Sequence, residues 1–320
     1  MAGGCLSGES VVACIPYYGC KEHVRRSVDS LLNQAYRNLI VVVANDGDAD
    51  TPWEELASID DDRLVRFEMA QNRGPYFATS VVLHACDAPY FLIQDADDWS
   101  DRRRVSVLLK ALQREQSNFA ISAQTLYSQT EGFMRPNAVR WTEVSMAPIP
   151  PRRFMLNPNI TPEFLYRAPH HGLFRSQALR DVGAYYVGLA LSYDRLVTNL
   201  LLMTGSASHV NTSLYSRLIR SGSLTHSPAT AWNSDRGLRE FEKCEWLYSQ
   251  CYEQYLKFKA GMLSLRALFA FMQELAWSQI TDADRASLTS EIERLRSQFG
   301  ERLFGARSIA VKAPKRFDPP

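Results

Sequence analysis

The sequence predicts an α/β protein with a doubly wound, mostly parallel, Rossmann-like sheet and a helical extension at its C-terminus. Three observations support this fold class. Short apolar segments alternate with helical ones from residue 10 to residue 123. The notable polar residues follow directly after the apolar segments, and the chain beyond residue 235 has only helical periodicity. Such alternation places helices on both faces of a parallel sheet through right-handed crossovers.

Five strands are expected in the first half of the chain. The segment 38–44 is apolar almost throughout, which is typical of a parallel strand covered on both faces. The other segments are also short and apolar, and each ends at polar or turn-forming residues. The predicted strands are 10–15, 38–44, 64–67, 90–93 and 119–123.

Helices are expected between these strands and again at the C-terminus. In the first helix, which begins near Glu22, Val24 and Val28 lie on one face because they are four residues apart. Near the C-terminus, an apolar stripe that includes Leu268 and Met272 indicates either packing on the sheet domain or a homodimer through the C-terminal helices. The predicted helices are 22–35, 76–85, 102–114, 241–259, 263–277 and 282–298.

The bulk composition restricts the classes of partner and compartment. Basic and acidic residues number 36 and 35, so the net charge gives no reason to expect a nucleic-acid partner. The six cysteines include no Cys-x-x-Cys pair and are expected to be free thiols in a reducing compartment. We find no signal peptide and no apolar window of transmembrane length. A cytoplasmic protein without a transmembrane segment is therefore expected.

A cluster of carboxylates follows the predicted strand 90–93. Asp95, Asp97 and Asp98 repel one another unless a cation lies between them, and Mn²⁺ or Mg²⁺ prefers oxygen ligands. The carboxyl ends of strands are also where open α/β sheets bind ligands. The alternative is a solvated acidic turn that caps the next helix through Ser100 or Asp101. The sequence thus predicts a divalent-cation site and leaves a capping turn open.

Two common nucleotide-binding motifs are absent. The first predicted strand continues into Pro16-Tyr17-Tyr18-Gly19 instead of a Gly-x-Gly-x-x-Gly turn, and no Walker-type phosphate loop occurs. Metal bridging by the acidic cluster is then the simplest way for the chain to hold phosphate.

Taken together, several motifs resemble those of family 2 glycosyltransferases with the GT-A fold. Five of them occur in family order across about ninety residues, and a sixth, looser match begins at residue 172. The resemblance reaches about residue 225. The motifs are Ile-Pro-Tyr-Tyr-Gly at 15–19, Ser-Leu-Leu-Asn-Gln-Ala-Tyr at 30–36, Val-Ala-Asn-Asp-Gly-Asp at 43–48, Asn-Arg-Gly-Pro-Tyr-Phe-Ala at 72–78, Gln-Asp-Ala-Asp-Asp-Trp-Ser at 94–100 and Gly-Leu-Phe-Arg-Ser-Gln-Ala-Leu-Arg-Asp-Val-Gly-Ala-Tyr at 172–185.

The resemblance implies an inverting transfer of a sugar from a nucleoside-diphosphate donor, with UDP expected, aided by Mn²⁺ or Mg²⁺. It implies that Pro16 and Tyr18 line the nucleotide pocket and that Asp46 reads the base. Asn72 or Arg73 would contact base or phosphates. The resemblance assigns ribose and metal to Asp95 and Asp97, with Asp98 as a further metal candidate. Gly19, Asn45 and Asp48 depart from the family pattern in the base-recognition turns.

On the acceptor side the same resemblance places the general base at Asp194, although Tyr193 replaces the acidic residue that usually precedes it. His170 and His171 are expected at the acceptor cleft, and at most one of them as a site residue, because neighbours in an extended chain point to opposite sides. Residues 215–226 resemble a flap over the diphosphate. There Arg220 suits a diphosphate by bidentate hydrogen bonding, and His226 is a candidate metal ligand.

The implied organisation has three parts. Residues 1–128 would bind the nucleotide sugar, residues 129–232 would bind a small-molecule, natural-product or glycan acceptor, and residues 233–320 would form the helical extension. Within the second part, 129–169 is expected to be an irregular acceptor loop. Two other functions stay open, a nucleotidyltransferase and an inactive sugar-nucleotide-binding protein.

Overall fold

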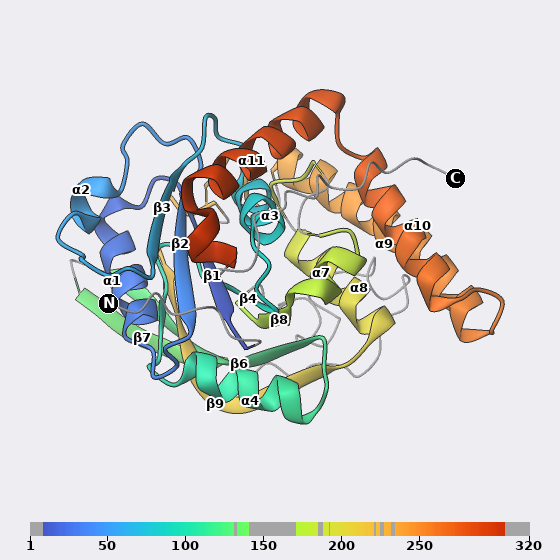
Figure 1. Ribbon diagram of the computed structural model, residues 1–320, viewed down its shortest axis with the longest axis horizontal. Coiled ribbons are helices and arrows are strands. Elements are labelled where there is room, and N and C mark those ends of the chain that lie inside the picture. The colour runs from blue at the N-terminus through green and yellow to red at the C-terminus, as the bar shows by residue number, and fades with distance from the viewer. Residues whose placement is uncertain are drawn as a thin grey trace.

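The structure, a computed structural model, describes residues 9–130, 133–140, 171–184, 188–191, 193–220, 222–224, 227–231 and 234–304. A single sheet with strand order β3-β2-β1-β4-β8-β6-β9-β5, and with β7 paired to β6, runs through the molecule (Figure 1). The strands are β1 Val11–Tyr17, β2 Leu39–Asn45, β3 Leu64–Glu68, β4 Tyr90–Ile93, β5 Trp99–Ser100, β6 Phe119–Thr130, β7 Phe133–Arg140, β8 Leu173–Arg175 and β9 Ala207–Ile219.

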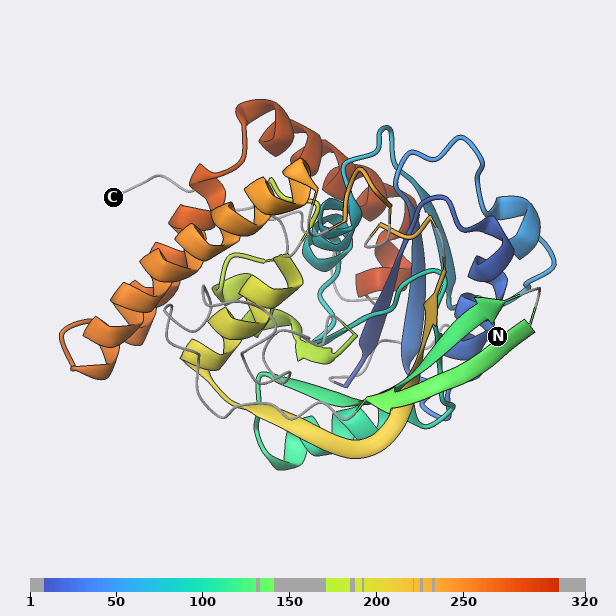
Figure 2. The same ribbon diagram turned by 180° about the vertical axis from the view of Figure 1, so that it is seen from behind.

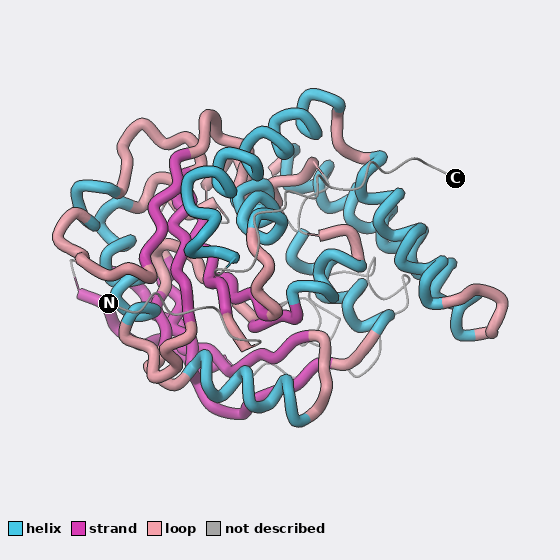
Figure 3. The backbone as a smooth tube through the Cα atoms, viewed as in Figure 1, coloured by secondary structure: helices cyan, strands magenta, loops and turns pink. Residues whose placement is uncertain are grey.

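Helices surround this sheet on both sides (Figure 3). They are α1 Lys21–Leu32, α2 Trp53–Leu56, α3 Pro75–Ala85, α4 Arg104–Arg114, α7 Ser176–Asp181, α8 Tyr193–Thr204, α9 Asp235–Lys259, α10 Leu265–Ser278 and α11 Asp282–Phe304.

The strand directions confirm a mostly parallel sheet. The strands β1, β2, β3 and β4 are mutually parallel, and β6 and β9 run the same way after the antiparallel β8. Only β5, β7 and β8 run against them among the described strands. Because the carboxyl ends of parallel strands meet at one edge, the turns after β1, β2 and β4 are brought together there.

The core lies on the two faces of the sheet. Side chains alternate across the pleat, so Val12 and Cys14 of β1 contribute to one apolar cluster, and Val11 and Ala13 contribute to the other. The helices α1 and α4 cover the second face, whereas α3, α8 and the C-terminal helices cover the first. Five cysteines among the described residues are buried and free, as expected from their spacing.

The expectation of an irregular loop over 129–169 is wrong for its beginning. Residues 133–140 form β7, which pairs antiparallel with β6 (Figure 2). Pro136 lies within this strand, and β7 tolerates it because an edge strand need not donate from every backbone nitrogen. The rest of the predicted loop, 141–169, lies outside the described residues.

The C-terminal helices share the core with the sheet. Leu268, Met272 and Leu295 belong to the same apolar cluster as Val12 and Phe77, which agrees with the predicted packing of the C-terminal stripe. Leu265, the first residue of α10, is instead 39% exposed. The helix α11 crosses α3, and α9 and α10 form a hairpin that projects beyond the sheet (Figure 1). Among the described residues, no helix combines the length and apolarity needed to span a bilayer.

Candidate active site

The turns after three parallel strands form one polar edge. Tyr17 at the end of β1 is in register with Asn45 at the end of β2, and Cys14 is in register with Ile93 of β4. The backbone nitrogen of Gln94 donates to the carbonyl of Cys14 at 3.1 Å. The acidic run that follows Gln94 therefore lies beside the turns that carry the predicted nucleotide-binding residues.

Asp46 is almost completely buried beneath this edge. Its Oδ1 accepts a hydrogen bond from the backbone nitrogen of Arg73 at 2.9 Å, and its Oδ2 accepts one from that of Gly74 at 2.7 Å. Burial raises the pKa of Asp46 to about 6, although these two hydrogen bonds and the nearby Arg73 charge act in the opposite direction. Asp46 thus holds the loop before α3, and the predicted reading of a base would use its remaining lone pairs.

The loop at 72–74 approaches the turn after β2 very closely. A side chain at Gly47 would meet the backbone of Gln71 and Asn72 at 2.5 Å, and Gly47 has a φ of +67°, so a glycine is needed there. The guanidinium of Arg73 forms an ion pair with Asp284 at the start of α11. Asn72 is exposed, which leaves its side chain accessible from the polar edge.

Asp98 is the most deeply buried of the clustered carboxylates. Its Oδ2 accepts from the Tyr215 hydroxyl at 2.6 Å, and its Oδ1 accepts from the backbone nitrogen of Leu218 at 2.7 Å. Burial, followed by the charges of Asp97 and Asp95, raises the pKa of Asp98 well above its ordinary value. A negative charge at this depth is favourable only when compensated, and a nearby cation would compensate it.

Asp97 is turned toward the end of β9. Its Oδ2 accepts from Nε of Arg220 at 2.7 Å, and both side chains are mostly buried. Burial and the charge of Asp95 raise the pKa of Asp97, against the influence of Arg220. Arg26 donates to the backbone carbonyl of Asp97 at 3.1 Å, and its guanidinium stacks on Trp99. Two predicted donor-binding residues, Asp97 and Arg220, are therefore in direct contact.

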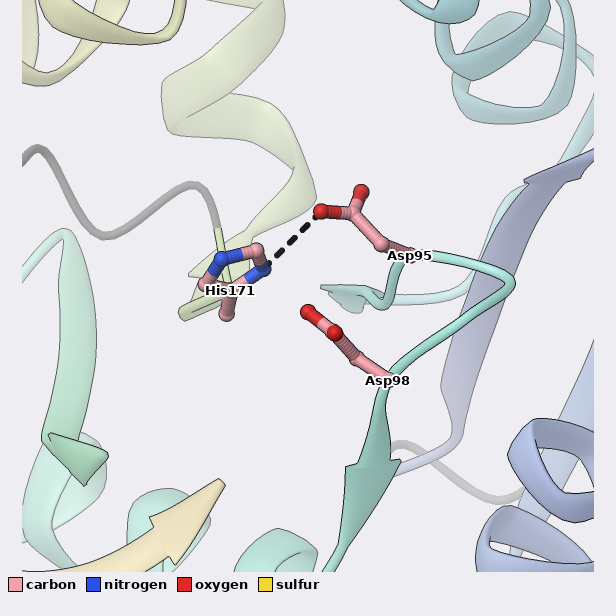
Figure 4. A group of neighbouring side chains, drawn as sticks. All are labelled: Asp95, Asp98 and His171. Atoms are coloured by element: carbon pink, nitrogen blue, oxygen red, sulfur yellow. Dashed lines mark ion pairs between the residues drawn. The ribbon is translucent and has the colours of Figure 1, made fainter. Parts of the chain in front are cut away.

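Asp95, Asp98 and His171 form a group of the size that a metal ion requires. Each offers one ligand atom, and these atoms lie within 4.8 Å of one another. Figure 4 shows that the three side chains converge from the loop after β4, from the residue just before β5 and from a position two residues before β8. The Nδ1 of His171 is 4.0 Å from Oδ2 of Asp95. Two carboxylate oxygens and one imidazole nitrogen form a donor set that suits Mn²⁺. The residues present thus fit a divalent cation.

A buried polar network centred on Arg104 lies next to the group of Asp95, Asp98 and His171. Arg104, fully buried at the start of α4, donates to Gln94 Oε1 at 3.1 Å, to the Ile93 carbonyl at 3.1 Å and to the His171 carbonyl. Its guanidinium lies 4.5 Å from the ring centre of Tyr215, and that ring stacks on His171. Because Arg104 donates to both Ile93 of β4 and His171, it fixes His171 relative to the acidic run.

Asp194 lies in the first turn of α8, across from α3. Its Oδ1 accepts a hydrogen bond from the Tyr76 hydroxyl at 3.0 Å. The segment just before α8 is anchored by Glu240 of α9, whose Oε2 accepts from the backbone nitrogens of Ala190 and Leu191, both at 2.7 Å. The predicted base is therefore attached to two helices that lie on either side of it in sequence.

Two of the remaining predicted site residues lie at the end of β1, and two lie outside the described residues. Pro16 lies near the end of β1, and Tyr18, just beyond it, is 55% exposed, which is unusual for so large a ring and leaves it available to a ligand. His170 and His226 lie outside the described residues. Sequence reasoning did not predict Tyr76, Arg104 or Tyr215 as site residues. Their contacts with Asp194, His171 and Asp98, respectively, join residues at least 67 positions apart along the chain.

Asp95, Asp97 and Asp98 form a partly buried acidic cluster at the carboxyl ends of the strands. This is where α/β enzymes bind their ligands. A profile of glycosyl transferase family 2 matches residues 12–183, more than half of the chain. The chain therefore belongs to glycosyltransferase family 2, as its motifs predict.

Curated relatives are similar over part of their length. Glycosyltransferase GlyA of Streptococcus pneumoniae is 26% identical over 128 residues, 40% of this chain and 18% of that protein. The Escherichia coli UDP-Glc:alpha-D-GlcNAc-diphosphoundecaprenol beta-1,3-glucosyltransferase WfaP is 25% identical over 36% of this chain and 45% of that one. The chain thus spans less than half of the length of either relative.

The fold matches that of a solved glycosyltransferase. The Staphylococcus aureus TarS fragment 1–349 in complex with UDP-GlcNAc superposes with a TM-score of 0.55 at 15% identity, covering 92% of each chain. At this identity the likeness shows the fold alone, which is the expected GT-A fold with a mostly parallel, curled sheet.

Proposed function

We propose that this protein transfers a sugar from a nucleoside-diphosphate donor, with UDP as the nucleotide, to a hydroxyl of a small-molecule or glycan-precursor acceptor, with inversion at the anomeric carbon. The observation that carries this proposal is the convergence of Asp95, Asp98 and His171 at the strand edge that also holds Asp46 and Arg73. A cation and a nucleotide pocket then lie side by side, as a diphosphate donor needs. The UDP complexes of TarS support the choice of nucleotide.

In the proposed reaction Asp194 accepts the proton of the acceptor hydroxyl. The oxygen so activated attacks the anomeric carbon, and the bond from that carbon to the diphosphate oxygen breaks with its electron pair on the diphosphate. Asp95, Asp98 and His171 would hold a divalent cation, which would compensate that negative charge. Arg220, which lies on Asp97, can exchange this partner for a phosphate oxygen, because the guanidinium binds both anions in the same way.

The burial of Asp97 and Asp98 gives a reason to expect that the donor and the cation bind cooperatively. Burial and mutual repulsion raise the pKa values of both Asp97 and Asp98. A cation favours the ionised forms, and it in turn attracts the diphosphate. We therefore expect UDP to bind far more tightly in the presence of Mn²⁺ than in its absence.

This coupling is tested by the thermal unfolding of the whole chain with UDP, Mn²⁺, both or neither. At a UDP concentration about 100 times its dissociation constant, the complex should be stabilised by about 2.7 kcal/mol, and only when Mn²⁺ is present. Asp95→Asn should remove this stabilisation. Asp101→Asn is the matched control, because Asp101 belongs to the same acidic run but pairs with the exposed Arg103.

Transfer itself is tested with a panel of UDP-sugars and acceptors. Asp95→Asn and Asp97→Ala should each lower kcat by about 100-fold or more, since even outer partners of a metal site cost roughly 10- to 100-fold. UDP should be the released product. Full activity in both variants, or activity that is indifferent to a chelator, would contradict the proposed mechanism. Release of pyrophosphate would instead indicate a nucleotidyltransferase, and tight UDP binding without turnover would indicate a binding protein.

A further inference from the structure

The hydroxyl of Tyr76 meets the predicted base directly. It donates a hydrogen bond to Oδ1 of Asp194 at 3.0 Å. The Tyr76 ring is packed in the apolar cluster between the sheet and the C-terminal helices, with 6% of its surface exposed. Asp194 is half-buried in the first turn of α8. The contact therefore joins a buried ring to a half-buried carboxylate.

The backbone that carries Tyr76 is itself fixed. Gly74 precedes α3 with a φ of +92°, and Pro75 occupies the first helical position, where its ring is pre-organised for a helix. The backbone nitrogen of Gly74 donates to the buried Asp46. A tyrosine has only two side-chain torsions to restrict, so the phenol is held by elements with little freedom to move.

We propose that Tyr76 is the positioning residue of the base: its hydroxyl holds Oδ1 of Asp194, so that Oδ2 is the oxygen that takes the acceptor proton. This inference rests on the proposed function, because it requires Asp194 to act as the base. The hydrogen bond from the Tyr76 hydroxyl occupies Oδ1 of Asp194. It also removes the free rotation that would otherwise direct either oxygen away from the acceptor.

Residues 73–76 contact both the turn after β2, where the donor is proposed to bind, and α8, which carries the proposed base. Arg73 and Gly74 face the turn after β2 through Asp46, and Tyr76 faces α8 through Asp194. The hydroxyl of Tyr76 donates to Asp194 of α8, whereas the backbone of Arg73 and Gly74 donates to Asp46. We therefore expect its removal to affect the chemical step and to leave donor binding unchanged.

The test uses Tyr76→Phe, which deletes the hydroxyl and keeps the packed ring. We expect kcat to fall about tenfold or more, a part of the roughly 100- to 10,000-fold that general-base catalysis contributes. The KM values for donor and acceptor should change by less than about twofold. The matched control is Tyr36→Phe. The Tyr36 hydroxyl donates to the carbonyl of Glu9 at 2.6 Å, near the amino ends of β1 and β2, and its loss should leave kcat unchanged.

A double variant separates this inference from the proposed function. Asp194→Asn alone should lower kcat strongly, and adding Tyr76→Phe should lower it by less than about twofold more, because the two residues act as a unit. If Asp194→Asn keeps full kcat, the proposed base is wrong. If Asp194→Asn loses activity while Tyr76→Phe has the kcat of the wild type, or has the same effect with and without Asp194, the positioning role is wrong.

Discussion

Asp46 is a buried carboxylate with a structural role and a proposed role in reading the base of the donor. Both of its oxygens accept backbone hydrogen bonds from the loop before α3, so it fixes the approach of that loop to the turn after β2. Burial nevertheless raises its pKa to about 6. The folded protein therefore favours the protonated form relative to the unfolded chain, where the carboxyl has its ordinary pKa near 4.

This shift predicts a pH dependence of stability. Because the folded pKa is raised, the contribution of Asp46 is fully present below pH about 4 and is lost as the pH rises through about 6. A shift from 3.8 to about 6 corresponds to at most about 3 kcal/mol. Relative to Asp46→Asn, which does not titrate, the wild type should lose unfolding free energy by up to this amount between pH 4 and 7.

Urea unfolding of both proteins across this pH range measures the effect. A variant of the exposed Asp62, Asp62→Asn, controls for the loss of one negative charge. The difference in unfolding free energy between the wild type and Asp46→Asn should change with pH. If this difference stays constant, or grows in favour of the wild type as the pH rises, the proposed cost of burying the charge is wrong.

At the scale of the secondary-structure element, α11 contacts the end of β3 and the loop before α3. Glu291 accepts from the backbone nitrogen of Ala70 at 3.0 Å, and Arg294 donates to the carbonyl of Glu68 at 2.6 Å. At the start of the same helix, Asp284 pairs with Arg73. One helix thus contacts the end of β3 and the loop before α3 at several points. The ion pair with Asp284 fixes the orientation of the Arg73 guanidinium.

We expect Asp284→Asn to weaken UDP binding by up to about tenfold, equivalent to 1.4 kcal/mol, because Arg73 loses the partner that orients it. The variant should change kcat much less. Isothermal titration with UDP and Mn²⁺ measures the affinity, and unfolding should show a loss of about 1 kcal/mol for this partly buried pair.

Asp282→Asn is the control from the same turn of α11. Asp282 pairs with Arg285 at 3.0 Å, but its side chain is 96% exposed, so the substitution should leave both UDP affinity and stability nearly unchanged. Equal effects of the two substitutions would attribute the change to the net charge of α11 and would exclude a specific action through Arg73.

At the scale of the whole molecule, the C-terminal helices are part of one core. Leu295 of α11 is fully buried in the apolar cluster that includes residues of β1, β2 and β4. The described part of the predicted extension, 234–304, is therefore not expected to unfold by itself, because its buried apolar residues share one cluster with the sheet.

Leu295→Ala should lower the unfolding free energy by about 2 to 5 kcal/mol and should shift one cooperative transition of the entire chain. Leu256→Ala on α9 is the control, because Leu256 is 51% exposed and should cost less than about 0.5 kcal/mol. Calorimetry of the wild type should show a single transition; two resolved transitions would mean that the extension is an independent unit.

Strands were predicted correctly from the sequence where the local pattern of apolar residues was strong. The strands at 38–44 and 90–93 are apolar runs that end at polar residues, and the structure has β2 and β4 within one residue of these bounds. The strand β7 was missed because its polar, proline-containing sequence has little periodicity of its own, and it becomes a strand by pairing with β6. The strand β9 has an irregular burial pattern and was missed for the same reason.

The sequence by itself determined the family, the GT-A fold and the acidic run after β4, since these depend on residues close together in the chain. Only the tertiary structure decided the partners: Asp97 with Arg220, Asp98 with Tyr215, Asp194 with Tyr76, and His171 with Asp95 and Asp98. The reason is physical. A strand or a helix is specified by neighbouring side chains, whereas a site is assembled where strand ends and helix starts from distant segments meet.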